Sequence, residues 1–159
     1  HDTSSLHTTK ELAHLGPELW QTSTKQFVEI LRAKSKMRIK QVLLNQEVLA
    51  GVGNIYCDES LWASGIHPLS VISAIPRQKM ARLHAELNKI TKASLAHGGD
   101  STSDYRDVDG RGGSHQTFHR AYRQAGKGCR KHGCTGQIER IVVASRGTHL
   151  CRNHQVLYV

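Results

Sequence analysis

The sequence is poor in aromatic residues, and it contains no long apolar run. Aromatic side chains make up 5% of the 159 residues and apolar residues of all kinds 38%, so the chain can bury one modest core or two small ones. This composition excludes a large enzyme cavity. No apolar run approaches the length of a membrane span, and no basic start followed by an apolar core resembles a signal peptide. These absences predict a cytoplasmic protein of one or two small domains, without a membrane partner.

Acidic residues are also scarce relative to basic ones. The chain has 13 Asp and Glu against 22 Lys and Arg, and it contains 11 His, which gives a formal net charge of +9. A polyanion is the expected partner, because each neutralised phosphate releases condensed counterions. Nucleic acid is therefore favoured over the alternative, a soluble basic protein with no such partner.

The cysteines are few and unevenly placed. Three of the four lie in the last 31 residues, and Cys57 is far from them, so paired disulfides fit poorly. The spacing is Cys129-x4-Cys134, sixteen intervening residues, then Cys151-x2-His154. Two short knuckles separated by a strand-like run are typical of a structural zinc site, in which four thiolate or imidazole ligands form a closed tetrahedron. One zinc ion without an open coordination position is therefore predicted.

Other readings of this cluster are open. Free thiols or a local disulfide are the alternatives to a metal. Among the ligands, His132 lies between the first two cysteines and could replace one of them, and His149 lies two residues before Cys151. We favour His154, because Cys-x2-His repeats the geometry of a knuckle.

The segment between the knuckles predicts a β-hairpin. Residues 137–150 alternate between apolar and polar, and the turn is expected at residues 145–148, with Gly147 free to adopt positive φ. The hairpin tip would then present Arg146. This side chain is either an ordinary surface arginine or, as a guanidinium fork on a rigid tip, a clamp for a phosphate.

The rest of the chain predicts helices. Thr22 or Ser23 can cap a first helix, Ser35 a second, and residues 77–97 carry an apolar stripe that predicts another. In the second helix, Ile39 belongs to the apolar face, whereas Lys36, Arg38 and Lys40 lie elsewhere, and a solvated face is one of two open readings of these cations.

The stretch "LAGVGNIYCDESLWASGIHP" predicts a glycine-bearing turn and a helix that begins at Asn54. Asp58 and Glu59 suit its first turn, and Gly65 with Pro68 ends it. Asn54 has two interpretations, which are compatible. It is either an N-cap, worth about 1 kcal/mol, or a donor to a phosphate that binds the unpaired N–H groups of the helix start.

The stretches "GVGNIY...ESLWASGIHP" and "IERIVV..RGTH.C" resemble the bacterial formamidopyrimidine-DNA glycosylase family, which includes the endonuclease VIII relatives. The resemblance extends from "LAHLGPE" through most of the chain. It implies a mainly α fold with a small β-hairpin, in which a helix-two-turns-helix domain precedes a zinc finger. By match to the family motifs, Asn54 and Arg146 would clamp phosphates around a flipped nucleotide, on damaged double-stranded DNA.

This resemblance divides the chain into four parts. Residues 1–20 are expected to be a linker from an N-terminal catalytic domain, and residues 21–100 the helical DNA-binding domain. Residues 101–124 would be a flexible loop that caps the lesion, and residues 125–159 the zinc finger. The implied protein is a monomeric bacterial repair enzyme of the nucleoid, a glycosylase and abasic-site lyase acting on oxidised purines such as 8-oxoguanine and formamidopyrimidine.

Two features depart from the family. Its usual finger has Cys-x2-Cys twice, whereas this chain has Cys-x4-Cys and His154 in the last place. Its nucleophile is an N-terminal proline followed by glutamate, whereas this chain begins with His1. No catalytic residue is therefore expected in this chain, and the alternative function is a non-catalytic, zinc-stabilised DNA-binding module.

Overall fold

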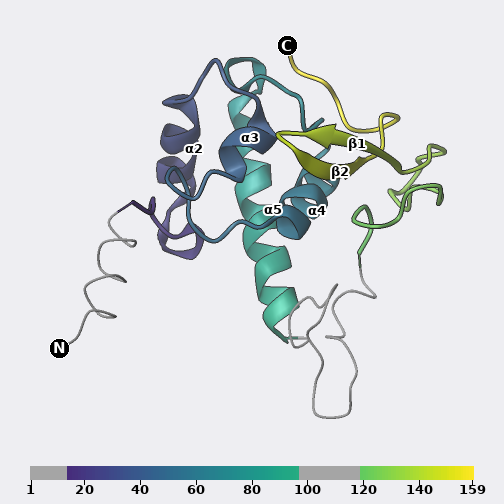
Figure 1. Cartoon of the computed structure of the whole chain (residues 1–159), viewed down its shortest axis with the longest axis horizontal. Helices are drawn as coiled ribbons and strands as arrows, with labels where there is room; N and C mark the ends of the chain where they lie inside the picture. The colour runs from purple at the N-terminus through teal and green to yellow at the C-terminus, as the bar shows by residue number, and fades with distance from the viewer. Residues whose placement is uncertain (1–13, 97–118) are drawn as a thin grey trace.

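The computed structural model describes residues 14–96 and 119–159, which form a mostly helical body and one β-hairpin (Figure 1). The predicted fold class is confirmed. In chain order the elements are η1 (Leu19–Gln21), α2 (Thr24–Arg32), α3 (Ile39–Leu43), α4 (Asn54–Ser64), η2 (Ile72–Ala74), α5 (Arg77–Ala96), β1 (Glu139–Val143) and β2 (Arg146–Leu150). Helix α4 contacts α5 on one side and strand β2 on the other.

Helix α2 begins where a capping residue was predicted. The Ser23 hydroxyl accepts a hydrogen bond from the Gln26 N–H, and the Gln26 side chain accepts one from the Ser23 N–H, which completes a capping box. Phe27, Val28 and Leu31 are buried on one face. The helix packs against α5 through this face.

Helix α3 is shorter than the sequence predicts. It begins at Ile39, with Arg38 as the N-cap, and not after Ser35. The reason is a tertiary contact, because the carbonyls of Ser35 and Met37 accept hydrogen bonds from Ser73 (2.8 Å) and Ile72 (3.0 Å). Backbone groups that pair with the η2 segment are not available for a helical turn.

Two turns connect α3 to α4. In the first, the N–H of Val48 donates to the Asn45 carbonyl at 2.9 Å. In the second, Gly51 has φ +99, a conformation that favours glycine. The Gln46 side chain fixes this turn, since it accepts from the Gly51 N–H and donates to the Val52 carbonyl, both at 3.0 Å.

Helix α4 is buried on almost every side, so its sequence shows no amphipathic pattern. Residues 57–62 and Ser64 are all buried. The helix ends at Gly65, which adopts the left-handed conformation (φ 77), as the sequence predicts. Its N-cap is Gly53, however, so the predicted capping role of Asn54 is wrong.

Helix α5 completes the core. Its predicted apolar stripe is confirmed by the buried Met80, Leu83 and Leu87, and its bounds agree with the prediction up to Ala96. Within the two described ranges, no helix has both the length and the apolar composition required to cross a membrane.

Part of the predicted interdomain linker is packed on the helical body. The Leu19 N–H donates to the Ala50 carbonyl, and the Ala50 N–H donates to the Pro17 carbonyl, both at 2.9 Å. Gly16 lies so close to the backbone of Val48 that a Cβ at this position would be 2.5 Å from the Val48 carbonyl carbon. Residues 16–19 therefore form part of the folded unit.

This close approach predicts that Gly16→Ala is destabilising. The added methyl group would force the segment off the body, and overpacking of this kind costs about 1–3 kcal/mol. Gly128→Ala is the matched control, because a Cβ at Gly128 meets nothing within 4 Å. Urea denaturation measures both free energies of unfolding, and equal stability of the two variants would contradict the packing of Gly16.

Candidate metal centre and nucleic-acid interface

The hairpin turn lies two residues earlier than the sequence predicts. Glu139 pairs with Leu150 and Val143 pairs with Arg146, so the two-residue turn is Ala144–Ser145. Both turn residues have positive φ (50 and 64), as a type I′ turn requires. The expected turn at residues 145–148 is therefore wrong, and Arg146 is the first residue of β2 and not the tip.

Gly147 is needed for a different reason from the one predicted. It lies in the strand opposite Val142 and is absent from the positive-φ glycines. A Cβ on Gly147 would lie 2.7 Å from Nη2 of Arg140 and 3.1 Å from its Nε. The absence of a side chain therefore lets the Arg140 guanidinium lie against the neighbouring strand.

The four predicted metal ligands lie together. One ligand atom each from Cys129, Cys134, Cys151 and His154 falls within 4.8 Å of all the others. The Cys134 and Cys151 sulfurs are 3.6 Å apart, and Cys129 Sγ is 3.4 Å from His154 Nδ1. A tetrahedral zinc with Zn–S bonds of about 2.3 Å places its sulfurs roughly 3.8 Å apart. The cluster therefore fits a tetrahedral metal ion, and all of its cysteines are free thiols.

Surrounding groups orient these ligands. The Trp62 indole N–H donates to Cys129 Sγ at 3.2 Å, and His154 Nε2 lies 2.9 Å from the Trp62 carbonyl, which directs Nδ1 toward the other ligands. Hydrogen bonds from the Asn153 amide and the Gly136 N–H lower the pKa of Cys134 to about 6. Burial raises the pKa of Cys151 to about 11. A thiolate is therefore already favoured at the more exposed edge of the cluster.

The alternative ligands are elsewhere. His132 is exposed and outside the cluster. His149 is buried, and its Nδ1 lies 3.5 Å from Asp58 Oδ2. Cys57 belongs to the helical core, where burial raises its pKa, so it is an inert apolar side chain.

Asp58 connects the hairpin to the helical body through a buried ion pair. Its Oδ1 lies 2.6 Å from Lys40 Nζ, and its Oδ2 accepts the His149 N–H at 3.0 Å. Lys40 also donates to the Thr148 hydroxyl at 2.7 Å. The solvated position, one reading of Lys40, is therefore wrong, since its side chain is fully buried between α3, α4 and β2.

Glu59, the next residue of α4, binds the end of the predicted capping loop. Its carboxylate accepts backbone N–H groups of Arg120 (2.8 Å), Ala121 (2.7 Å) and Tyr122 (2.7 Å). Residues 119–124 are thus anchored on α4, while the rest of that loop, up to residue 118, lies outside the described residues. Neither carboxylate acts at the helix start, where the sequence placed them.

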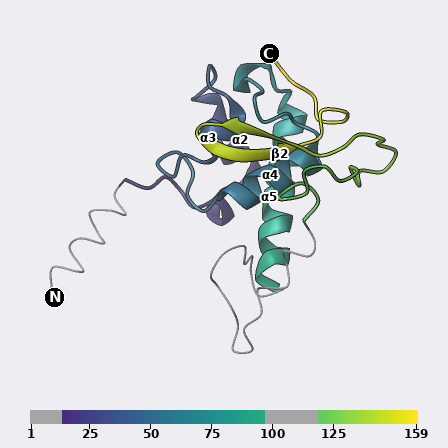
Figure 2. The same cartoon turned by 45° about the vertical axis from the view of Figure 1, so that its right-hand side comes forward.

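The other end of α4 holds the metal-binding loop. Lys131 Nζ donates to the Ala63 carbonyl at 2.9 Å and lies 5.5 Å from the centre of the Trp62 ring. Together with the Trp62 contacts to Cys129 and His154, this fixes the finger along the whole length of α4. In Figure 2 the hairpin is seen lying against the helices.

Asn54, at the start of α4, contacts the residue that follows Arg146 in β2. Asn54 Nδ2 donates to the Gly147 carbonyl at 3.1 Å. Arg146 is exposed and shares the strand face of Val143 and Thr148, because side chains alternate along a strand. Burial raises the pKa of the Cys57 thiol on α4, and the positive charge of Arg146 offsets a small part of this increase.

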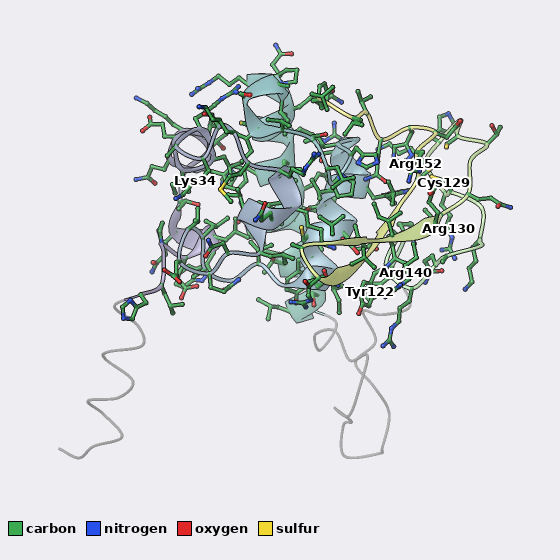
Figure 3. All side chains as sticks on the ribbon, turned by 45° about the horizontal axis from the view of Figure 1, so that its top comes forward. Lys34, Tyr122, Cys129, Arg130, Arg140 and Arg152 are labelled. Atoms are coloured by element: carbon green, nitrogen blue, oxygen red, sulfur yellow. The ribbon has the colours of Figure 1, made fainter. Side chains whose placement is uncertain are left out.

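Positive charge is concentrated in the finger. Residues 119–159 contain eight Lys and Arg against one acidic residue, Glu139, in a chain of net charge +9. Figure 3 shows Arg130, Arg140 and Arg152 together on the finger side of the molecule, with Lys34 on the opposite side. A polyanion would therefore be drawn to the finger and the adjoining start of α4.

The helical part of the chain matches a known family. The family model described as "Formamidopyrimidine-DNA glycosylase H2TH domain" matches residues 15–106, which are more than half of the chain. The chain belongs to this family. The H2TH part of a formamidopyrimidine-DNA glycosylase corresponds here to α3, the two turns, α4 and the helices around them.

Formamidopyrimidine-DNA glycosylases from several bacteria resemble the chain over most of its length. That of Solibacter usitatus is 39% identical over 146 residues, which cover 92% of this chain and 54% of the relative. That of Lactobacillus gasseri is 38% identical over 159 residues, covering 99% and 56%. The chain thus spans about half the length of the curated relatives it matches.

Solved structures of the family have the same fold. The MutM (Fpg) protein of Thermus thermophilus superimposes with a TM-score of 0.81 at 36% identity, over 91% of this chain and 55% of that one. Lactococcus lactis Fpg in complex with DNA that contains an abasic site has a TM-score of 0.81 at 33% identity, over 96% and 56%.

Sequence reasoning missed the residues that attach the finger to the helices. The sequence pattern indicates a helix-dipole role for Asp58 and Glu59, and a solvated face is one reading of Lys40. One signal was present, because two adjacent acids stand beside apolar residues in a helix of a basic chain. The backbone partners of the two acids could not be inferred, since these come from residues 61 to 91 positions later, and the Lys40 side chain that pairs with Asp58 comes from a different helix.

Removal of the metal is predicted to unfold the finger. His154→Ala should lower the bound metal well below one ion per chain, whereas His154→Cys should retain it, because a thiolate can replace the imidazole. His132→Ala is the matched control, since this exposed histidine is outside the cluster. Elemental analysis of the purified variants measures the metal content, and full loading of His154→Ala would contradict the ligand assignment.

Breaking the buried ion pair is predicted to be costly. Asp58→Asn leaves the Lys40 ammonium buried without its partner charge, which typically costs about 3–5 kcal/mol. The double variant Lys40→Met with Asp58→Asn should lose less than the sum of the two single variants. Arg82→Met, which breaks the exposed Arg82–Glu86 pair, is the control and should change the free energy of unfolding by at most about 0.5 kcal/mol. Chemical denaturation measures these four variants and the unaltered protein, and strict additivity would contradict the coupling.

Proposed function

We propose that the chain is the DNA-binding, C-terminal part of a base-excision-repair enzyme. This enzyme would be a glycosylase that removes oxidised purines and a lyase that cleaves the resulting abasic site. The observation that carries this proposal is the contact between Asn54 and the Gly147 carbonyl. It joins the start of α4 to the hairpin, beside the exposed Arg146. Asn54 and Arg146, the two residues that the family motifs assign to phosphate binding, therefore belong to one rigid unit.

The chemistry of Asn54 suits a phosphate. Its Nδ2 carries two hydrogens, and the Gly147 carbonyl accepts only one of them, so a second donor remains. The first N–H groups of α4 and its dipole add positive potential at the same place. Because the helix is buried on its other sides, this end is held in a fixed position.

Zinc is the metal that best fits the cluster. Three thiols and one imidazole are soft ligands typical of zinc, and a set of four protein ligands leaves no position for water or substrate. The ion would stabilise the loops at the base of the hairpin, opposite the turn. Its role is therefore to hold β1 and β2 in place on α4, and not to take part in bond cleavage.

The bond-breaking residues of this proposal lie outside the chain. Lys40 is fully buried but paired with Asp58, so it is unsuited to act as an amine nucleophile. We infer that a part of the protein outside this chain supplies the amine, as the N-terminal proline does in the family that the sequence resembles, and that the protein acts on DNA in the bacterial cytoplasm.

A non-catalytic, zinc-stabilised DNA-binding module is the alternative. A regulator would present a recognition helix to base edges. Helix α4 has most of its residues buried, and Asp58 and Glu59 are engaged by the finger, so it presents no such face.

The proposal is tested by duplex binding at several salt concentrations. Arg146→Ala is expected to weaken the affinity for a duplex with an abasic site about tenfold, and to reduce the salt slope by about 1, since one phosphate contact is lost. Lys34→Ala is the matched control, because Lys34 is exposed on the opposite side of the molecule. Fluorescence anisotropy gives both quantities.

Equal effects of the two substitutions would overturn the proposal. If Arg146→Ala and Lys34→Ala weaken binding to the same small extent, the finger only stabilises the fold and does not clamp phosphate. Borohydride treatment of the abasic complex adds a second readout. A trapped covalent imine would show that the nucleophile lies within this chain after all.

A further inference from the structure

The connection between α3 and α4 decides where α4 begins. It runs over residues 44–53, and half of these residues are exposed, so packing fixes only part of it. Val52 is the packed residue nearest to α4, with 1% of its surface exposed. Gly51 and Gly53 stand on either side of it, and both are exposed. One buried valine between two glycines leaves the backbone that leads into Asn54 free to rotate unless other groups hold it.

The side chain of Gln46 holds this backbone. Its Oε1 accepts a hydrogen bond from the Gly51 N–H, and its Nε2 donates to the Val52 carbonyl, both at 3.0 Å. A longer contact of 3.5 Å joins Nε2 to the Leu44 carbonyl. Both ends of the amide are therefore bound to the main chain of one connection. Water could satisfy the same backbone groups at an exposed turn, so the contribution of the glutamine is to fix the shape of the turn.

The main chain of Gln46 is held from another direction. The Gly16 N–H donates to the Gln46 carbonyl at 2.8 Å, within the packed segment 16–19. A Cβ on Gly16 would lie 2.5 Å from the Val48 carbonyl carbon, so the two segments are in close contact here. Gln46 is thus fixed at its main chain by one part of the fold, and its side chain reaches the residues that precede α4.

The first turn of α4 has few other restraints. Its N-cap is Gly53, which has no side chain to cap the helix, and an uncapped helix start frays unless the backbone before it is held. The Asn54 side chain is held on one side by the Gly147 carbonyl at 3.1 Å, whereas its Oδ1 has no hydrogen-bond partner among the described residues. The orientation of this turn therefore depends on the backbone that Gln46 binds.

We propose that Gln46 is a positioning residue for DNA binding, which acts by holding residues 51–53 so that Asn54 and the first turn of α4 keep their binding orientation. Gln46 itself has no contact with DNA in this proposal. Without its amide, the start of α4 would adopt the binding orientation for only part of the time, and the apparent affinity would fall by that fraction. The inference rests on the proposed function, because it acts through Asn54.

Gln46→Met removes both hydrogen bonds and keeps the length and charge of the side chain. It should weaken the affinity for an abasic-site duplex about threefold to fivefold, the equivalent of one hydrogen bond. The salt slope should stay unchanged, because no cation is lost. Asn45→Ala is the matched control, since it removes a 3.0 Å side-chain bond to the Glu47 N–H in the same connection but away from residues 51–53. Fluorescence anisotropy is measured at a temperature where circular dichroism shows each variant to be folded.

A double-mutant cycle separates positioning from a general loss of stability. In an Asn54→Ala background, Gln46→Met should lose at most about half of its effect on affinity in the unaltered protein, because the two residues act through one helix start. NMR of the free protein gives a second readout. The amide resonances of Val52 and Asn54 should shift or broaden in Gln46→Met, whereas that of Leu87 in α5 should not.

Failure of the inference and failure of the proposed function give different results. If Asn54→Ala weakens binding but Gln46→Met binds like Asn45→Ala, the positioning role is refuted and the proposed function stands. Strict additivity of Gln46→Met and Asn54→Ala also refutes it, because Gln46 would then act independently of the start of α4. If neither Asn54→Ala nor Arg146→Ala weakens binding, the proposed function itself fails, and the inference fails with it.

Discussion

The burial of two adjacent carboxylates on α4 is the constraint on which the rest of the structure depends. Asp58 and Glu59 are at most 6% exposed, and a buried carboxylate is strongly destabilising unless it is paired or hydrogen-bonded. Lys40 and the finger, mainly through backbone N–H groups, supply the partners that the structure describes for them. The finger must therefore dock on α4 in one register, since any other position leaves a charge without compensation.

This docking explains how a small metal-binding loop can position groups far from the metal. The ligand cluster is held at the Trp62 end of α4, whereas Asn54 contacts the hairpin at the opposite end. Between them, Asp58 and Glu59 bind β2 and the 120–122 segment. Helix α4 thus fixes the position of the hairpin, and of the arginines on it, relative to the N-terminal end of the helix. A zinc ion alone would stabilise the loop but would not fix the hairpin relative to the helices.

The sequence predicts what depends on local rules and misses what depends on contacts between distant segments. The capping box at Ser23, the helix end at Gly65 and the ligand spacing around Cys129 follow from neighbouring residues, and all three are found. The buried state of Lys40 could not be predicted, because a lysine at a helical position has the same local pattern whether it faces solvent or Asp58. The predicted turn is two residues too late because a glycine favours a turn conformation, whereas Gly147 gives space to the cross-strand Arg140.

The most direct test of this account is native-state amide hydrogen exchange of the metal-loaded chain. The N–H groups of Ala121, Tyr122 and His149 donate to the α4 carboxylates, and the N–H of Leu87 lies in the core helix α5. If the finger and helices are one cooperative unit, all four amides exchange with the same opening free energy, equal to that of global unfolding. Markedly faster exchange of the first three, with Leu87 still protected, would show that the finger undocks independently and would contradict the account.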